Sequence, residues 1–523
     1  MVVCNSIFEL YVELFISCCS WFYYKVNSTI TCKNYLSVNS ICIRSPENKF
    51  NNRFMKQIFK IQAITIFLVM FFLNTAHSQN QSTDLLFNKW GGQLDLSKDK
   101  SITIVFRLWL ENNSVKASMD SPNQGVKDIP ADSVVIKANT VYISIDTFKI
   151  IYKGKFNEKD TSIFGTFSQG SFNQDILLKP YKVNRPQEPK KPFPYKEIEV
   201  TVPNGLVILS ATLTLPEGKG PFTAVVLISG SGPQDRNEEL FYHKPFMVIA
   251  DYLTRNGFAV LRYDDRGTAK STGDYKTAAI NEFASDAYAA FTFLKNYPGV
   301  NPAKVGLIGH SEGGMIAPLL ASQHPEIAFI ILMAGPGIRG DQLLLLQSEL
   351  IYKNAKVPAN ALKTDQETKK KAFAVILSES DTAKIRTKIK KIYSKVDESD
   401  LLQLGMKKSQ IDLVVKQYTT PEVLSIIRFD PCPVLKKVKC PVLALDGDKD
   451  MQVPSKQNLK AVQTCLAEVV NTNVTIKELW YLNHLFQSAT TGAISEYYEI
   501  EETVSPVALD AMGEWLSGIV KNK

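Results

Sequence analysis

Histidine is scarce in this chain, with five residues among 523. A catalytic or metal-bound imidazole therefore has few candidates. The sequence also lacks any cluster of His, Cys and carboxylate residues with the spacing of metal ligands. The phosphate-binding pattern G-x-x-x-x-G-K-[ST] is absent as well. We therefore predict that the protein works without a metal or a cofactor.

A strong charge imbalance is also missing. The formal net charge is +8, and the positive residues are not gathered in one basic stretch. We therefore expect no nucleic-acid partner. Hydrophobic residues make up 45% of the chain and charged residues 21%, which is the composition of a globular protein. The length suits two or three domains.

Cysteine is nearly absent from most of the chain. Five of the eight cysteines lie in residues 1–54, and the others are Cys432, Cys440 and Cys465. With so few thiols, the main part of the chain is not expected to contain a disulfide framework.

A signal-like segment stands where the cysteine content changes. Met55 opens "MKQIFKIQAITIFLVMFFLNTAHSQNQ", which has a basic start, an apolar run and a small-residue cleavage site. That order is typical of a secretory signal peptide. We expect residues 55–78 to be this signal and residues 1–54 to be a non-native upstream extension. The alternative is a genuine N-terminal extension with an internal anchor helix.

The product is expected to be exported, to the periplasm or outside the cell. No cysteine follows the apolar run, so a lipid anchor is not expected. No later segment has the 18 or more apolar residues of a membrane span. We therefore expect no stable membrane anchor once the signal is removed.

Residues 79–184 predict a small all-β domain. The stretches "SITIVFRLWL" and "DILLKPYKV" are rich in β-branched and aromatic residues, and turns fall at Asn, Asp and Gly. We expect a sandwich or a barrel that is either a structural or oligomerisation module, or a module that binds carbohydrate or gates the substrate. Residues 185–194 contain four prolines and predict an extended linker that keeps two domains apart.

Residues 195–523 alternate between apolar strands and helical segments. "TAVVLISGSG" is a continuous apolar run, typical of a strand buried on both faces, and "FMVIADYLTRNG" has helical spacing. The alternation predicts a mostly parallel sheet with crossover helices, which binds ligands beyond the carboxyl ends of its strands. A Leu- and Lys-rich interruption at about 341–430 predicts a helical cap. Its lysines form either a solvated face or a positively charged entrance for anionic substrates.

A candidate nucleophile lies in "VGLIGHSEGG". Ser311 stands in a G-x-S-x-G pattern, where a predicted strand gives way to a helix. A nucleophilic serine in such a strained turn needs small neighbours, and the N-terminus of the following helix favours developing negative charge. The alternative is a glycine-rich turn that happens to contain serine.

A serine hydroxyl needs a base, and the base needs an orienting carboxylate. Of the five histidines, His484 is the one just past a predicted late strand. The stretch "LALDGDKDMQVP" supplies the acid. Asp450 is favoured because it can reach over the strand tip. Asp448, in the turn, is the alternative, and Asp446 lies on or at the end of the strand.

Taken together, these motifs resemble the α/β-hydrolase superfamily. The resemblance rests on "LISGSGPQDRNE", "RYDDRGTAKSTG", "GHSEGG", "LDGDKDMQVP" and "LNHLFQ", and covers roughly residues 195–522. More narrowly, the chain resembles secreted bacterial esterases of the prolyl-oligopeptidase-like and serine-aminopeptidase-like branch. The expected fold is therefore an α/β-hydrolase fold with a helical cap, preceded by the all-β domain.

The resemblance implies roles for individual residues. Ser311 would be the nucleophile, His484 the base and Asp450 its orienter. The backbone N–H groups of Glu312 and Ser231 would form the oxyanion hole. Many relatives carry His where Ser229 stands, a change that leaves the backbone donor in place. Charged residues near the site are expected to brace its loops by salt bridges rather than to touch the substrate: Asp235, Arg236, Arg262, Asp264 and Arg266.

The expected reaction is hydrolysis of a small carboxylic ester through an acyl-enzyme. One rival is a serine peptidase of the aminopeptidase type that acts on short peptides. The other is a catalytically inactive, exported binding protein on a hydrolase scaffold.

Overall fold

The computed structural model describes residues 85–97, 100–112, 114–468 and 471–521. The predicted extension (1–54) and signal (55–78) lie outside the described residues. Contacts divide the chain into one unit of Met1–Asn80 and another of Gln81–Lys523, and all described residues belong to the second. In these ranges, no helix combines the length and the apolar character needed to cross a membrane.

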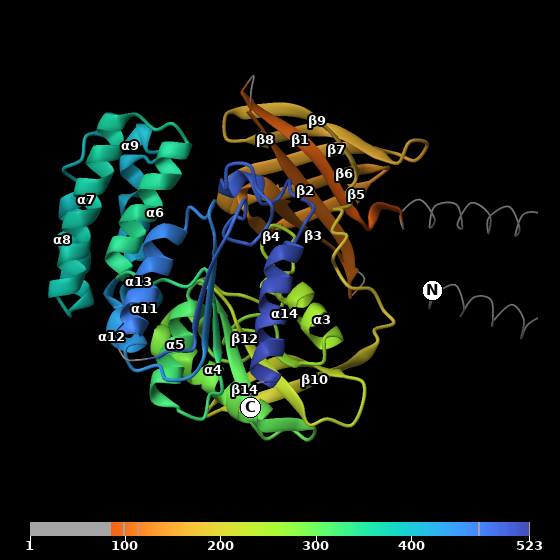
Figure 1. Ribbon diagram of the computed structural model, residues 1–523. Coiled ribbons are helices and arrows are strands. Elements are labelled where there is room, and N and C mark those ends of the chain that lie inside the picture. The colour runs from red at the N-terminus through yellow and green to blue at the C-terminus, as the bar shows by residue number, and fades with distance from the viewer. Residues whose placement is uncertain (1–84, 98–99, 113, 469–470, 522–523) are drawn as a thin grey trace, which may run out of the picture. The chain divides into compact units, whose positions relative to one another are not determined.

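The first part of the described chain is one nine-stranded antiparallel sheet, in the order β4-β3-β2-β1-β9-β8-β7-β6-β5 (Figure 1). β5 contacts β3, so the sheet curls into a barrel-like shape rather than forming two stacked layers. The strands are β1 (Lys89–Ser97), β2 (Lys100–Glu111), β3 (Ser114–Ser121), β4 (Val126–Pro130), β5 (Ser133–Lys137), β6 (Thr140–Ile145), β7 (Ile150–Asn157), β8 (Ser162–Gln169) and β9 (Phe172–Pro180).

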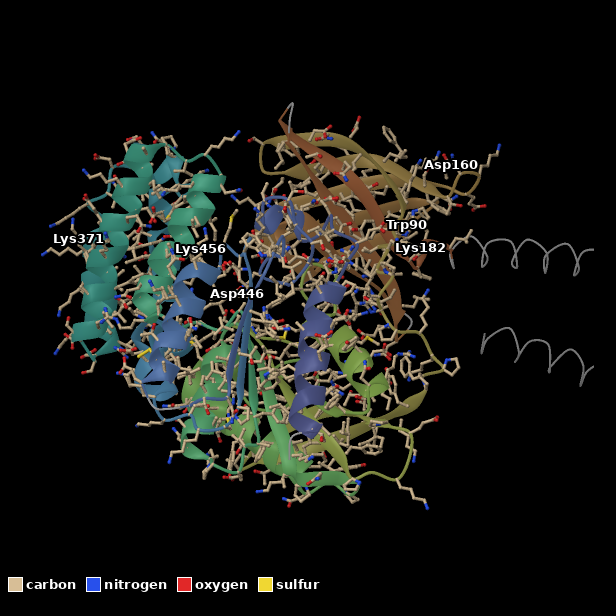
Figure 2. The ribbon with its side chains drawn as sticks, viewed as in Figure 1. Trp90, Asp160, Lys182, Lys371, Asp446 and Lys456 are labelled. Atoms are coloured by element: carbon tan, nitrogen blue, oxygen red, sulfur yellow. A yellow bond between two sulfur atoms is a disulfide. The ribbon has the colours of Figure 1, made fainter. Side chains whose placement is uncertain are left out.

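Aromatic side chains fill the interior of this sheet. Along β7, buried and exposed residues alternate, as expected when one face of a strand packs on a core. Tyr152 of β7 stacks on Phe106, with ring centroids 5.1 Å apart. Trp90 is fully buried (Figure 2), and its indole N–H donates to Leu86 O at 2.9 Å.

The second sheet has eight strands in the order β10-β11-β13-β12-β14-β15-β16-β17. β10, β11 and β13 pair antiparallel, and all other neighbours are parallel. The strands are β10 (Tyr195–Asn204), β11 (Val207–Pro216), β12 (Phe222–Ile228), β13 (Ala259–Tyr263), β14 (Val300–His310), β15 (Ile330–Met333), β16 (Val442–Gly447) and β17 (Val474–Leu479). The carboxyl ends of β14, β16 and β17 therefore meet at one edge.

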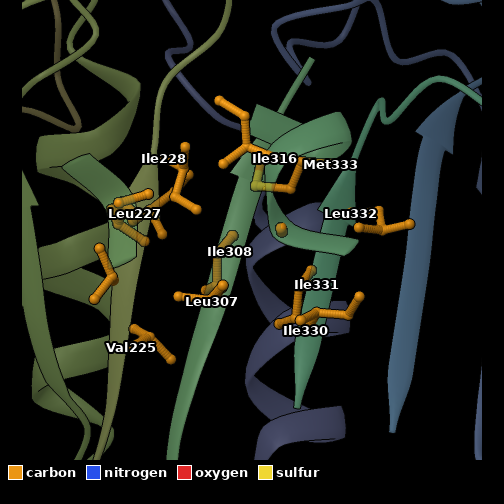
Figure 3. Close-up of a cluster of buried hydrophobic side chains, with 14 of the residues drawn as sticks. Val225, Leu227, Ile228, Leu307, Ile308, Ile316, Ile330, Ile331, Leu332 and Met333 are labelled. Atoms are coloured by element: carbon orange, nitrogen blue, oxygen red, sulfur yellow. The ribbon is translucent and has the colours of Figure 1, made fainter. Parts of the chain in front are cut away.

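Helices cover both faces of this sheet (Figure 1). α3 and α14 contact each other on one face, while α4 and α5 contact each other on the opposite face. Because both faces are covered, the central strands are apolar throughout, and their Val, Leu and Ile side chains form the main core (Figure 3). The helices are α3 (Pro245–Arg255), α4 (Ile280–Lys295), α5 (Gly313–Gln323), α12 (Pro431–Leu435), α13 (Ser455–Ala467) and α14 (Pro506–Lys521).

Six helices between β15 and β16 form the cap. They are α6 (Gly340–Asn354), α7 (Ala359–Ser378), α8 (Thr382–Tyr393), α9 (Glu398–Gln403), α10 (Ile411–Tyr418) and α11 (Pro421–Arg428). The cap has a hydrophobic core of its own, centred on residues such as Phe373, Ile385 and Ile427. The helices lie where the sequence predicts them, at about 341–430.

Two of the three cysteines in the described residues form a single disulfide, which the sequence did not predict. Cys432 of α12 and Cys465 of α13 are joined by a disulfide, with their Cα atoms 5.3 Å apart. The two residues are 33 positions apart in sequence, and the packing of α12 against α13 brings them together. Cysteine spacing alone gives no sign of that packing.

Residues 185–194 are not a free spacer, which differs from the expectation. The Arg185 guanidinium donates to the backbone carbonyls of Tyr242, Phe241, Tyr498 and Ile500 at 2.8–3.2 Å. An arginine has five N–H donors, so one side chain can tie several loop carbonyls at once. This segment is therefore anchored to the loops of the second sheet.

Candidate active site

Ser311 occupies a strained turn between β14 and α5. Its φ is +52°, a left-handed value that is uncommon for any residue but glycine. The flanking glycines allow the turn. A Cβ on Gly309 would lie 2.0 Å from Gly313 O, and a Cβ on Gly313 would lie 2.2 Å from Ile228 O. The two glycines of the G-x-S-x-G pattern are therefore required by close backbone contacts.

Asp450 and His484 form a buried pair. Asp450 Oδ2 lies 2.7 Å from His484 Nδ1, and the two side chains are 0% and 6% exposed. Asp450 Oδ1 accepts from the N–H groups of Gln452 and Val453, at 2.7 and 2.9 Å. Both carboxylate oxygens of Asp450 are thus fixed. The hydrogen bond at Nδ1 holds the ring of His484 and leaves its other nitrogen, Nε2, outside this pair.

The other two aspartates of this stretch have different partners. Asp448 accepts from the N–H of Tyr481 and lies 3.7 Å from the Lys449 ammonium, so it is not paired with His484. Burial raises the pKa of Asp446 well above its usual value, and the Asp450 charge and hydrogen bond raise it further. This shift favours the neutral form of Asp446 (Figure 2), which disfavours a second negative charge beside Asp450.

His310, which the sequence analysis set aside, links the parts of the site. Its Nδ1 lies 2.8 Å from Glu238 Oε1, and its Nε2 lies 2.9 Å from His484 O. Burial opposes a charge on His310, but the Glu238 carboxylate, the His484 carbonyl and the Asp450 charge together raise the His310 pKa above its usual value. A protonated ring donates from both nitrogens. It then holds the backbone of His484 next to the nucleophile turn.

The loop after β12 carries the predicted oxyanion donor. Gly230 N–H donates to Glu238 Oε1 at 2.7 Å, and Gly232 N–H donates to Glu422 Oε1 at 2.8 Å. Between them, the Ser231 N–H has no acceptor in the part of the chain that the structure describes. A Cβ on Gly230 would lie 3.2 Å from the Ser311 Cβ, so this loop borders the nucleophile.

The second predicted oxyanion donor is the backbone N–H of Glu312. The N–H of Glu312 follows Ser311 at the start of α5, and it meets no acceptor among the described residues. The Ser311 hydroxyl also lacks a hydrogen-bond partner within these residues. Hydrogen bonds of this kind are often formed only when substrate binds. The structure brings Asp450 and His484 together, and it places Ser311 next to the loop of Ser231.

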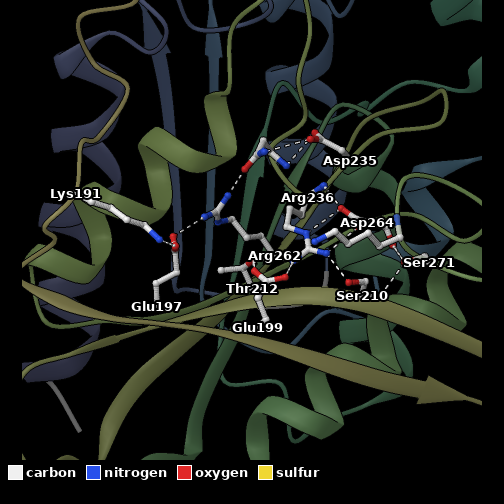
Figure 4. Close-up of polar contacts among 12 residues, drawn as sticks. Lys191, Glu197, Glu199, Ser210, Thr212, Asp235, Arg236, Arg262, Asp264 and Ser271 are labelled. Atoms are coloured by element: carbon white, nitrogen blue, oxygen red, sulfur yellow. Dashed lines mark hydrogen bonds and ion pairs between the residues drawn. The ribbon is translucent and has the colours of Figure 1, made fainter. Parts of the chain in front are cut away.

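The charged residues expected to brace the loops do form such contacts (Figure 4). Arg236 binds Asp264 through two nitrogens, at 2.9 and 2.8 Å, and also reaches Glu199 at 2.7 Å. The Asp235 carboxylate accepts from Asn237, which in turn accepts from Arg262. Arg266, the last of these residues, pairs with Asp286 at 2.6 Å.

A cavity of about 540 Å³ opens between the cap and the oxyanion loop. Ser231 and Gly232 line it on the side of the sheet, and Glu422 and Val423 of α11 line it on the side of the cap. Its volume lies within the ordinary range of small-molecule sites. In the described ranges, no group of His, Cys, Asp and Glu is arranged to hold a metal ion.

The chain is similar in sequence to known hydrolases. A family model described as "Serine aminopeptidase, S33" matches residues 242–402. Esterase EstD of Thermotoga maritima is 24% identical over 456 residues, which is 85% of this chain and 94% of that protein. The chain therefore has the fold of an α/β hydrolase and is similar in sequence to this family. The family match includes Ser311 but ends before Asp450 and His484, so the acid and the base of this hydrolase rest on the geometry described above.

Other relatives are more distant or partial. Thiohydrolase aneE of Aspergillus aculeatus is 31% identical over 141 residues, which is 26% of the hydrolase and 40% of that protein. An esterase of Pyrococcus furiosus, Pf2001, is 20% identical, with a TM-score of 0.37 and coverage of 65% of this chain and 98% of its own. Est1E of Butyrivibrio proteoclasticus, solved with ferulic acid, is 16% identical, with a TM-score of 0.36 and coverage of 62% and 100%.

Proposed function

We propose that this hydrolase cleaves carboxylic esters through an acyl-enzyme on Ser311. The observation that carries the proposal is the buried Asp450–His484 pair at 2.7 Å. It lies at the same sheet edge as a serine held at positive φ. The extended similarity to an esterase supports the ester substrate.

In the proposed mechanism, Ser311 Oγ attacks the ester carbonyl carbon while His484 Nε2 takes the hydroxyl proton. The N–H groups of Ser231 and Glu312 stabilise the oxyanion of the tetrahedral intermediate. His484 then gives its proton to the leaving alcohol oxygen, and the acyl-enzyme remains. Water attacks the acyl carbon, again with His484 as the base, and the acid is released as Ser311 regains its proton.

Labelling with a fluorophosphonate tests this proposal. We expect a single adduct, found by mass spectrometry on the peptide that contains Ser311, together with loss of hydrolysis of p-nitrophenyl butyrate. The Ser311→Ala variant is the control and should not be labelled. Hydrolysis that continues without an adduct at Ser311 would exclude the serine mechanism. A protein with neither adduct nor hydrolysis would favour the inactive binding protein.

A peptidase is the second candidate, because the matching family model is described as a serine aminopeptidase. The same machinery would then cut an amide. Comparing p-nitrophenyl acetate and butyrate with aminoacyl p-nitroanilides separates the two. We expect kcat/KM to be higher for the esters, and a preference for the anilides would assign the hydrolase to peptides.

We further propose that the protein is exported after removal of residues 55–78. The Cys432–Cys465 disulfide supports this, since such bonds persist in oxidising compartments. N-terminal sequencing of the natural protein should find a chain that begins near Gln79. A chain that begins near Met1 would contradict both the signal and the upstream extension.

A further inference from the structure

Glu422 connects the cap to the body of the hydrolase at a single carboxylate oxygen. It is the second residue of α11, which follows the N-cap Thr420. Its Oε1 accepts from Gly232 N–H at 2.8 Å and from the Tyr275 hydroxyl at 2.5 Å. Gly232 follows β12, and Tyr275 lies in the connection after β13, so three separate segments meet at one oxygen.

The oxyanion loop is held at both ends by carboxylates. Glu238, which belongs to the body, binds the Gly230 N–H, and Glu422, which belongs to the cap, binds the Gly232 N–H. Each bond fixes one rigid peptide plane. The Ser231 N–H belongs to the plane between those two. Fixing both neighbours limits the directions in which the Ser231 N–H can point.

Glu312, the residue after the nucleophile, interacts with Glu422 from the body side. Burial raises the pKa of Glu312 well above its usual value, the charges of Glu422 and Asp265 raise it further, and its carboxyl group hydrogen-bonds Glu422. Burial also raises the pKa of Asp265, to about 8. These effects favour the protonated form of Glu312, which lies beside Glu422. It supports Glu422 from the body side, directly after the nucleophile.

We propose that Glu422 is a positioning residue, through which the cap orients the oxyanion loop so that the Ser231 N–H meets the developing oxyanion. The idea rests on the proposed function, because it needs an oxyanion. In this proposal, the oxyanion hole is correctly arranged for catalysis when α11 contacts the oxyanion loop through Glu422. The cap then contributes to the chemical step as well as to the walls of the cavity.

The test compares kcat and KM for p-nitrophenyl butyrate in three variants of the full chain. Glu422→Ala removes the acceptor, and we expect kcat to fall about 10- to 100-fold with KM within about threefold, since a misplaced donor loses stabilisation of the transition state while binding of the ground state changes little. Glu422→Gln keeps an acceptor oxygen for the Gly232 N–H and should stay within about fivefold of the wild type. Tyr275→Phe should lie between these two.

Ser425→Ala is the matched control. Ser425 is on the same helix, and its Oγ accepts from the Ile280 N–H at 3.1 Å, so this variant loses a contact between cap and body that does not involve the oxyanion loop. We expect its kcat to be close to that of the wild type. An equal fall of kcat in Ser425→Ala and Glu422→Ala would overturn the proposal in favour of general cap docking.

Two further outcomes would also overturn it. One is a Glu422→Ala variant with wild-type kcat. The other is a Glu422→Gln variant whose KM rises for aminoacyl p-nitroanilides alone, which would make Glu422 a binder of the substrate amine.

Failure of the proposed function is recognised separately, because the wild type would then not be labelled at Ser311 by a fluorophosphonate. The affinity for a trifluoromethyl ketone, whose adduct places an anion in the hole, should fall in parallel with kcat across the series.

Discussion

Asp450 is bound to His484 through one oxygen and to two backbone N–H groups through the other. Asp448, two residues earlier, binds the N–H of Tyr481 and does not reach the ring. The strand β16 ends at Gly447, and the turn that follows carries Asp450 back over the strand tip, where its N–H donates to Gly447 O at 3.1 Å. The geometry of this turn thus places Asp450, and not Asp446 or Asp448, against the ring of His484.

Replacing each aspartate by asparagine should separate their roles. Asp450→Asn removes the charge that stabilises the imidazolium and can leave the wrong tautomer facing Ser311. We expect kcat/KM for p-nitrophenyl butyrate to fall by up to about 10⁴-fold, as in similar triads. Asp448→Asn should keep it within a few fold. An inactive Asp448→Asn beside a normal Asp450→Asn would make Asp448 the acid while leaving the hydrolase assignment intact.

Two substitutions at Ser311 test its chemical role and its backbone strain separately. Ser311→Ala should abolish turnover with little change in the melting temperature, because the side chain adds little to the core. Ser311→Gly should also be inactive but more stable, by about 1 kcal/mol, because glycine adopts φ of +52° without steric cost. Activity within tenfold of the wild type in either variant would show that Ser311 is not the nucleophile.

The sequence was informative where a local pattern has one structural solution. Gly309 and Gly313 flank Ser311, and each makes a backbone contact that excludes any Cβ. The apolar run of β12 likewise required a strand covered on both faces. The hairpin of β10 and β11 had a local signal too, since a glycine at the first position of a two-residue turn, here Gly205 before Leu206, is favoured between two strands. The first strand predicted for the second sheet is "TAVVLISGSG", so β10 and β11 were not predicted.

The rest of the site depends on contacts between residues far apart in sequence. Glu422 meets Gly232 across 190 positions, and Glu238 meets His310 across 72. An isolated glutamate on a helix is most often a solvated residue, so no local pattern marks Glu422. The disulfide has the same origin, because the contact of α12 with α13 brings its two cysteines together. Each of these needs the packed structure.

The cap cavity should set the length of the acyl group. Val423 lines it together with Ser231 and Gly232. Val423→Trp should narrow it, and we expect KM for p-nitrophenyl octanoate to rise about tenfold or more, while the acetate ester changes little. Leu413→Trp, at a side chain that is 64% exposed on α10, is the control and should leave both esters unaffected. Equal effects of Val423→Trp on both esters would place the acyl group elsewhere.

The disulfide should contribute to stability through the loop that it closes. The two cysteines are 33 residues apart, and a loop of that size stabilises the folded state by about 3–4 kcal/mol in the chain-entropy account. The double variant Cys432→Ser/Cys465→Ser should therefore unfold at lower urea concentration than the wild type. Adding a reductant should lower the wild-type midpoint toward that of the variant and leave the variant unchanged. A wild-type unfolding curve that does not change with the reductant would mean that the two thiols are not joined.

The pair of His310 and Glu238 should make stability depend on pH. The pKa of His310 is raised in the folded protein, where burial is opposed by the Glu238 carboxylate, with smaller contributions from the His484 carbonyl and the Asp450 charge. The folded state therefore keeps a proton that the unfolded chain has lost above about pH 6.5. The stabilisation is complete below that pH and is lost as pH rises through the folded pKa.

Glu238→Gln keeps an acceptor for the Gly230 N–H but removes the charge that holds this proton. The melting temperature, followed from pH 5 to 10, should then begin to fall at lower pH than in the wild type, and the alkaline limb of kcat/KM should move the same way. Glu239→Gln is the matched control, since it removes an equal charge from the next residue, which pairs with Lys127 at 2.7 Å rather than with His310. Coincident pH curves for the two variants would show that Glu238 does not hold the proton on His310.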